Sequence, residues 1–215
     1  MLWRNILLSK GYFNLPVLFV LISFSYSGLS QIEFSGGVEF GASSSQLSGD
    51  TYSGFDKFGL SCGPYVKVTF SEKSSGRLGI LYLNKGSKKN PDPENEDSES
   101  FTFRLNYIEI PLAYAYKLNN VRVEGGMAFG RLISSSEIGT DGIEREIDAD
   151  IPFRGMDYSL ILGVNYFFSE NIFVNGRWSQ SIIPVRKSPN VVNSASFYEA
   201  GMYNTAFQLM FGYEF

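Results

Sequence analysis

The sequence predicts an all-β fold, an eight-stranded antiparallel up-and-down transmembrane β-barrel that follows a cleaved signal peptide. Large apolar residues alternate with small or polar residues in eight segments, and a period of two places successive side chains on opposite faces of a strand. Short and long connections join the segments in turn, as in membrane barrels with tight periplasmic turns and long outer loops. With 215 residues, of which 44% are hydrophobic, the chain suffices for one domain and is too polar for a helical membrane protein.

The N-terminal segment has the layout of a secretory signal peptide. Two basic residues precede an apolar run over residues 15–24, and the small residues Gly28 and Ser30 follow it. A membrane-anchoring helix would need about 20 apolar residues, roughly twice the length of this run. We therefore expect residues 1–30 to be a signal peptide, and residues 31–215 to form one outer-membrane β-barrel domain.

The first four strands are expected at residues 32–40, 57–70, 78–83 and 101–116. In the third, Leu81 and Leu83 make both faces apolar, so the alternation does not decide which face points outward. In the fourth, the apolar positions change from odd to even numbers after Tyr107. We expect a β-bulge at Tyr107 and Ile108, which absorbs one residue and keeps both apolar sets facing outward.

The last four strands are expected at residues 121–129, 156–168, 172–181 and 203–215, where the alternation keeps its phase. In the eighth, Phe211, Tyr213 and Phe215 lie on one face, and the last of them ends the strand. A final strand with a terminal aromatic residue resembles the sorting signal of bacterial outer-membrane barrels. The resemblance implies that these three residues are a membrane-assembly signal read by the barrel-assembly machinery, and that the apolar face meets lipid.

The connections differ in length and composition. The long ones are expected at residues 42–56, 86–100, 133–153 and 184–202, and they are rich in Gly, Ser, Asn, Asp and Pro. The short ones are expected at residues 71–76, 117–120 and 169–170. We expect the long connections outside the cell and both ends of the barrel in the periplasm.

The composition excludes several classes of function. A net charge of -4 provides no basic surface for nucleic acid. The chain has no histidine, which is the usual general base near neutral pH, so we expect no enzyme activity, no catalytic residue, no cofactor and no metal centre. Acidic clusters in the long loops could hold a divalent cation through oxygen ligands, but their spacing matches no known loop motif. The single cysteine, Cys62, excludes an internal disulfide.

Five short motifs resemble the PorT-like outer-membrane β-barrel family, a set of small barrels from Gram-negative bacteria. They are Gly86-Ser87-Lys88 after Leu81-Tyr82, the run from Leu105 to Leu112, Gly125-Gly126 with Phe129-Gly130, Asp157 leading to Gly163, and the terminal Phe215. The resemblance spans essentially all of the chain after the signal peptide. It implies an eight-stranded barrel in the outer membrane. The family's namesake is associated with protein secretion across that membrane.

Charged residues at inward positions predict a network inside the barrel. The predicted members are Glu39, Glu109, Arg177, Asp157, Arg104, Lys67, Arg122 and Glu124, and Glu33 and Glu214 are also expected to point inward. Counting residues from the periplasmic turns places Arg177 level with Glu39 and Glu109, so we expect Arg177 to hold these two carboxylates together. Two buried carboxylates could instead share acid and base roles in an enzyme. Mixed charges in so narrow a lumen favour a salt-bridged plug.

These features together predict a non-enzymatic protein of the cell outer membrane. Its role would be structural, or a surface interaction carried by the long outer loops, with the lumen plugged by salt-bridged side chains. Its expected partners are outer-membrane lipid and lipopolysaccharide, whose phosphates Lys85, Lys88 and Lys89 could touch. The alternatives are a narrow channel or accessory component of protein secretion across the outer membrane, and a soluble lipocalin-like barrel with the apolar faces turned inward.

Overall fold

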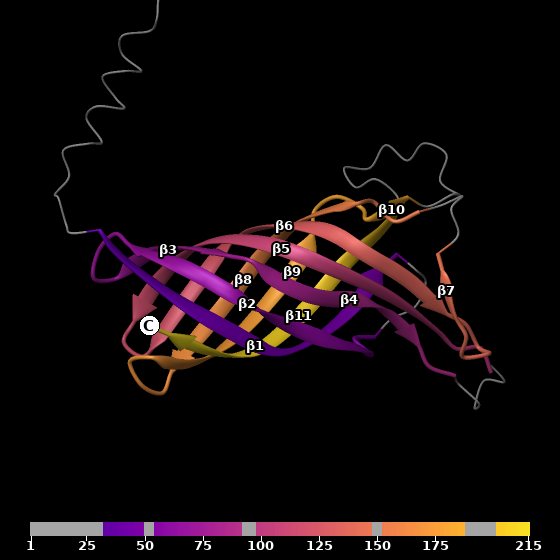
Figure 1. Cartoon of the computed structure of the whole chain (residues 1–215), viewed down its shortest axis with the longest axis horizontal. Coiled ribbons are helices and arrows are strands. Elements are labelled where there is room, and N and C mark those ends of the chain that lie inside the picture. Colours follow the sequence, from indigo (N-terminus) through magenta and orange to yellow (C-terminus); the bar gives the residue numbers. More distant parts are fainter. Residues whose placement is uncertain (1–31, 50–53, 92–97, 148–151, 188–200) are drawn as a thin grey trace, which may run out of the picture. The chain divides into compact units, whose positions relative to one another are not determined.

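The computed structural model describes residues 32–49, 54–91, 98–147, 152–187 and 201–215 (Figure 1). The predicted signal peptide lies outside the described residues, as do parts of the long connections. Among the described residues, no helix is long and apolar enough to cross a membrane.

Eleven strands make up the described part of the fold. They are β1 (Glu33–Ser48), β2 (Lys57–Thr69), β3 (Ser74–Gly79), β4 (Leu81–Lys89), β5 (Phe101–Leu118), β6 (Val121–Ile138), β7 (Glu144–Glu146), β8 (Met156–Phe167), β9 (Ile172–Ser181), β10 (Arg186–Lys187) and β11 (Gly201–Glu214). Antiparallel pairing runs from β1 through β2, the successive strands β3 and β4, β5, β6, β8, β9 and β11, and β11 returns to β1. The predicted eight-stranded barrel is therefore confirmed, with β3 and β4 sharing one position in the wall (Figure 1).

The outer wall of the barrel is apolar. Side chains such as Phe40, Leu162 and Leu209 lie on it with 62%, 59% and 59% of their surface exposed, while neighbours of the other parity such as Glu39, Ile161 and Gln208 are buried. Large apolar groups on a closed barrel's outside match a hydrocarbon surrounding. The inward-facing apolar arrangement of a lipocalin-like barrel is therefore excluded.

The weakly predicted third strand consists of β3 and β4, interrupted at Ile80. The alternation continues across the interruption: Leu78 and Ile80 are exposed on the outer wall, while Leu81 and Leu83 are buried inside. The apolar character of both faces thus has two causes, lipid on one side and a packed interior on the other.

The β-bulge was predicted on the wrong strand, β5, whereas the structure has it on β6. In β5 the odd positions stay inward throughout, so Phe103, Leu105 and Tyr107 are buried in the barrel instead of facing lipid. The extra residue is in β6, where Asn106 pairs with Ser134 but Tyr107 pairs with Leu132. The apolar residues at odd positions of β5 resemble lipid-facing residues because the outer half of this lumen is itself apolar.

Several strands extend into the predicted long loops. β1 continues to Ser48 and remains paired with β11 there, as Ser48 with Tyr203. β4 and β6 likewise reach Lys89 and Ile138. These Ser-rich ends have loop-like composition, yet the neighbouring strands still satisfy their backbone groups. The barrel wall is therefore longer at the loop end than the alternation of apolar residues predicts.

The wall is weakest between β2 and β4. In the described part these strands pair only at Ser61 with Leu83 and at Cys62 with Tyr82, and we call the region beyond these pairs the β2–β4 seam. Two carbonyls of β4 at the seam accept side-chain hydrogen bonds from β1. Ser43 Oγ donates to the Asn84 carbonyl at 2.8 Å, and Ser45 Oγ donates to the Gly86 carbonyl at 3.1 Å.

Candidate functional site: the charged lumen

The centre of the lumen holds two arginines and two glutamates in a closed ring of ion pairs, which we call the middle ring. Arg77 Nη2 lies 2.5 Å from Glu39 Oε2, and its Nη1 lies 3.1 Å from Glu124 Oε2. Arg177 Nη1 lies 3.3 Å from Glu39 Oε1, and its Nη2 lies 2.8 Å from Glu124 Oε1. Each guanidinium therefore bridges both carboxylates. All four residues are buried.

Glycines leave room for the charged side chains of the middle ring and of the layer above it. Gly163 of β8 pairs with Glu124 on one side and with Arg177 on the other, so the two charged side chains meet across it. A Cβ on Gly163 would lie 2.7 Å from Glu124 Oε1. Gly130 of β6 lies in the same way between Glu109 and Asp157. In both places, a glycine on one strand leaves room for the charged side chains of the two strands beside it.

The lower layer lies near the short turns and centres on Glu214. Its carboxylate accepts hydrogen bonds from Arg122 Nη1 at 2.9 Å, from the Tyr65 hydroxyl at 3.0 Å and from Lys67 Nζ. This layer carries one more cation than anion. The Tyr65 ring connects it to the middle ring, because the Arg77 guanidinium lies 3.7 Å from the ring centroid.

The upper layer centres on Lys85, which is completely buried. Its ammonium contacts Glu109 and lies 3.1 Å from Asp157 Oδ2. Asp157 also accepts hydrogen bonds from Ser181 Oγ at 2.6 Å and from Asn204 Nδ2 at 3.0 Å. This layer has one more anion than cation, which is the opposite of the lower layer.

An apolar plug fills the lumen beyond the upper layer. It consists of the buried side chains of Leu47, Phe103, Leu105, Tyr107, Phe153 and Val185. Phe153 and Val185 belong to connections that were predicted as outer loops, and the Val185 carbonyl accepts a hydrogen bond from Arg154 N at 2.7 Å. The Lys85 ammonium lies 5.4 Å from the centroid of the Tyr107 ring, which joins the plug to the charges below it.

The predicted lumen residues are placed with two corrections. Arg177 contacts Glu39, as expected, but its second partner is Glu124, because Glu109 lies in the upper layer with Lys85. Equal residue counts do not give equal heights, since the strands of a barrel are tilted and staggered. Arg104 is not in the lumen. It has the outward parity of β5, and its Nη1 lies 3.3 Å from Glu144 Oε2 on the outside.

Two cations of the layers, Arg77 and Lys85, were missing from the predicted inward-facing charges, whereas Glu214 was expected to point inward and does so. Lys85 was instead expected at the outer surface. Both cations share the inward parity of their strands, and Lys85 follows Leu81 and Leu83 at spacings of four and two. Strict parity counting through β3 and β4 could have found the two cations.

The terminal aromatic residues lie on the outer wall. Phe211, Tyr213 and Phe215 are exposed there, and the last residue is fixed by two backbone hydrogen bonds with Gly36, at 2.8 and 3.1 Å. Their part in membrane assembly stays a prediction.

Comparison with known proteins agrees with this architecture. A family model described as an outer membrane protein beta-barrel domain matches residues 14–186. The chain belongs to this family. Its location is accordingly the outer membrane. A search of curated proteins finds no match.

Two solved structures are among those similar to this chain. Neisserial surface protein A (NspA) has 13% identity and a TM-score of 0.50, with 85% of this chain and 99% of that chain covered. Ail, the attachment invasion locus protein of Yersinia pestis, has 12% identity and a TM-score of 0.48 over the same shares of the two chains. At such identities the likeness concerns the fold alone.

Proposed function

We propose that this outer-membrane protein is a closed, non-enzymatic barrel whose rigid wall holds outer loops for interactions at the cell surface. The middle ring carries this proposal, because it places two salt-bridged arginines across the centre of the lumen. Loops on a rigid frame are where recognition usually occurs.

The packing around the middle ring supports a closed lumen. The cavity that touches Glu39, Arg77 and Arg177 has a volume of only about 10 Å³. Such a volume is near the minimum that holds a single water molecule. A wider vestibule of about 540 Å³ opens on the side of the short turns and is lined by Lys67, Arg122 and Glu214 of the lower layer.

The use of the lumen carboxylates supports a non-enzymatic role. Glu39 and Glu124 are each bonded to both arginines, and Glu109 and Asp157 share Lys85. A pair of acids with separated roles needs environments that favour different protonation states. Here every one of these carboxylates lies against a buried cation, so their surroundings are alike in this respect.

Conductance across a planar bilayer tests the closed lumen. The purified wild type should give no stepwise current, whereas Arg77→Ala combined with Arg177→Ala should open small steps, because both cations of the middle ring are lost. Lys187→Ala, outside the lumen, is the matched control. A conducting wild type would favour the alternative role as a narrow channel or an accessory of protein secretion.

Proteolysis of intact cells tests the placement of the loops. Trypsin should cut after Lys187 in the last long connection and should leave the short turn at Lys73 intact until the outer membrane is broken. Cleavage at Lys73 in intact cells would show that the barrel has the reverse orientation and would contradict the proposed surface role.

Membership of the PorT-like family, which the sequence motifs suggest, stays a prediction.

A further inference from the structure

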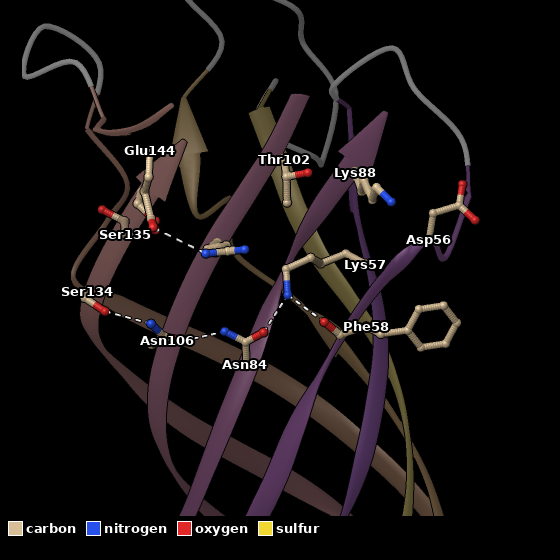
Figure 2. A pocket seen from close by; sticks show the side chains of 12 residues that line it. Asp56, Lys57, Phe58, Asn84, Lys88, Thr102, Asn106, Ser134, Ser135 and Glu144 are labelled. Atoms are coloured by element: carbon tan, nitrogen blue, oxygen red, sulfur yellow. Dashed lines mark hydrogen bonds and ion pairs between the residues drawn. The ribbon is translucent and has the colours of Figure 1, made fainter. Parts of the chain in front are cut away.

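A polar groove of about 750 Å³ is cut into the outer wall beside the β2–β4 seam (Figure 2). The outer-wall groove, as we call it, is lined by Asp56, Lys57, Phe58, Asn84, Lys88, Thr102, Arg104, Asn106, Ser134, Ser135, Ser136 and Glu144. It lies outside the lumen, so its chemistry is independent of whether the barrel conducts.

A row of hydrogen-bonded side chains crosses the wall at the bottom of the groove (Figure 2). Lys57 Nζ donates to Asn84 Oδ1 at 2.5 Å, Asn84 Nδ2 donates to Asn106 Oδ1, and Asn106 Nδ2 donates to Ser134 Oγ at 2.8 Å. The extra residue in β6 gives Ser134 this position, because it changes the parity of the strand and pairs Ser134 with Asn106.

The wall becomes apolar immediately below this row. Tyr82 and Ile108, one step further down β4 and β5, pair with each other, and Ile110 and Leu112 continue the exposed apolar face. At this level the outward-facing side chains of β4 and β5 change from polar to apolar. The groove therefore lies at the depth of the lipid headgroups of the outer leaflet.

Lys57 is the unusual member of the groove. It is 6% exposed, and its ammonium donates to two neutral oxygens, Asn84 Oδ1 and the Phe58 carbonyl at 2.7 Å. No carboxylate of the described residues forms an ion pair with it. A buried charge without a counter-ion is strongly unfavourable. The other cations that line the groove, Arg104 and Lys88, are exposed near its rim.

We propose that the outer-wall groove binds the phosphorylated sugar headgroup of an outer-leaflet glycolipid. The phosphate lies against Lys57, where it supplies the missing counter-ion, and Arg104 and Lys88 add charge at the rim. Amide and hydroxyl groups of the polar row bond the sugar, while the acyl chains follow the apolar wall past Ile108. This apolar wall favours an amphiphile over free phosphate. The carboxylates of Asp56 and Glu144 favour a headgroup with few phosphates.

Thermal shifts of the purified full-length protein in detergent test the ligand. The probes are lipid A, which is a phosphorylated disaccharide lipid, its dephosphorylated form, and inorganic phosphate at equal concentration. Lipid A alone should raise the unfolding temperature, because a ligand that binds only the folded state stabilises it. An equal shift with inorganic phosphate would overturn the assignment to a lipid. An equal shift with the dephosphorylated lipid would overturn the assignment to an anion.

Variants of Lys57 test its part in binding lipid A. Lys57→Met should weaken lipid A binding at least tenfold and leave the lipid-free protein no less stable, because it removes an uncompensated charge. Lys73→Met, at an exposed turn on the other end of the barrel, is the matched control and should bind as the wild type does. A lower unfolding temperature with unchanged affinity would make Lys57 a clamp of the seam and overturn the proposal.

A second variant covers a failure of Lys57→Met to fold. Arg104→Gln combined with Lys88→Gln changes only exposed rim residues and should weaken lipid A binding several-fold. Wild-type affinity in this double variant would overturn the proposed role of the groove's cations.

Discussion

Two buried lysines on either side of the β2–β4 seam have opposite surroundings. Lys85 of β4 points into the lumen and contacts two carboxylates, Glu109 and Asp157. Lys57 of β2 lies at the outer-wall groove and bonds only neutral oxygens. Both are almost fully buried, at 0% and 6% exposure. The fold therefore compensates the charge of Lys85, whereas the charge of Lys57 is left for a ligand to compensate.

The lumen as a whole follows the pattern of Lys85. Among the described residues its three layers contain five cations and five carboxylates, all in ion pairs. Burying ions repays its desolvation cost only when the partners and hydrogen bonds are complete. Every ion of these layers has an oppositely charged partner, whereas Lys57 in the groove has none among the described residues.

Breaking the middle ring should be the most destabilising change. Glu124→Ala leaves Arg77 and Arg177 facing each other with one carboxylate, which we expect to cost about 3 to 5 kcal/mol. Urea unfolding followed by the mobility of the folded barrel on gels would measure it. Glu144→Ala is the control, because its ion pair with Arg104 is exposed, and it should leave unfolding unchanged. Equal unfolding of the two variants would mean that the ring has no special weight.

A cation placed on the lipid face has no partner at all. Leu162→Arg, in the apolar band of β8, should cost roughly 2 to 4 kcal/mol and reduce the yield of folded barrel. Ile143→Arg, at an exposed position between β6 and β7, should fold normally. The contrast would confirm that a cation is tolerated in the connection beyond β6 but not in the apolar band of the wall. Normal folding of Leu162→Arg would contradict the assignment of this face to lipid.

The sequence predicts which side of the wall a side chain faces better than it predicts which side chain it contacts. A period of two was enough to place Glu39, Glu124 and Arg177 inside the barrel, since parity is local to each strand. Their partners depend on tilt and stagger, which no single strand contains. For that reason Glu109 was placed one layer too low.

Lys57 and Arg104 show a second limit. Parity assigns Lys57 to the interior, but the short pairing of β2 with β4 lets its ammonium reach Asn84 at the groove. Arg104 was assigned to the lumen because the apolar residues Phe103 and Leu105 were read as lipid-facing. An apolar plug inside a barrel and lipid outside it select the same residue types, so composition alone does not separate them.

Removing Lys85, whose charge is compensated, should destabilise the barrel more than removing Lys57. Lys85→Met leaves Glu109 and Asp157 without their cation, and we expect a loss of about 3 kcal/mol, because two buried carboxylates then face each other unpaired. Lys57→Met, measured in the same denaturant series, should show no loss. If both lysines proved equally costly to remove, the distinction between the two environments would disappear.

The smallest effect is expected for an exposed ion pair, that of Asp141 and Arg145 beyond the end of β6. The Arg145 side chain donates to Asp141 Oδ1 at 3.0 Å, and with the Ile143 amide it lowers the pKa of Asp141 from 3.8 to about 2. A lowered carboxyl pKa contributes stability above its unfolded value, and that contribution is lost as the pH falls through about 2. Arg145→Gln should move the pKa of Asp141 back toward 3.8 in an NMR titration, without changing the unfolding of the barrel at neutral pH. A clear loss of barrel stability at neutral pH would show that this exposed pair acts like those of the lumen, which its exposure to water argues against.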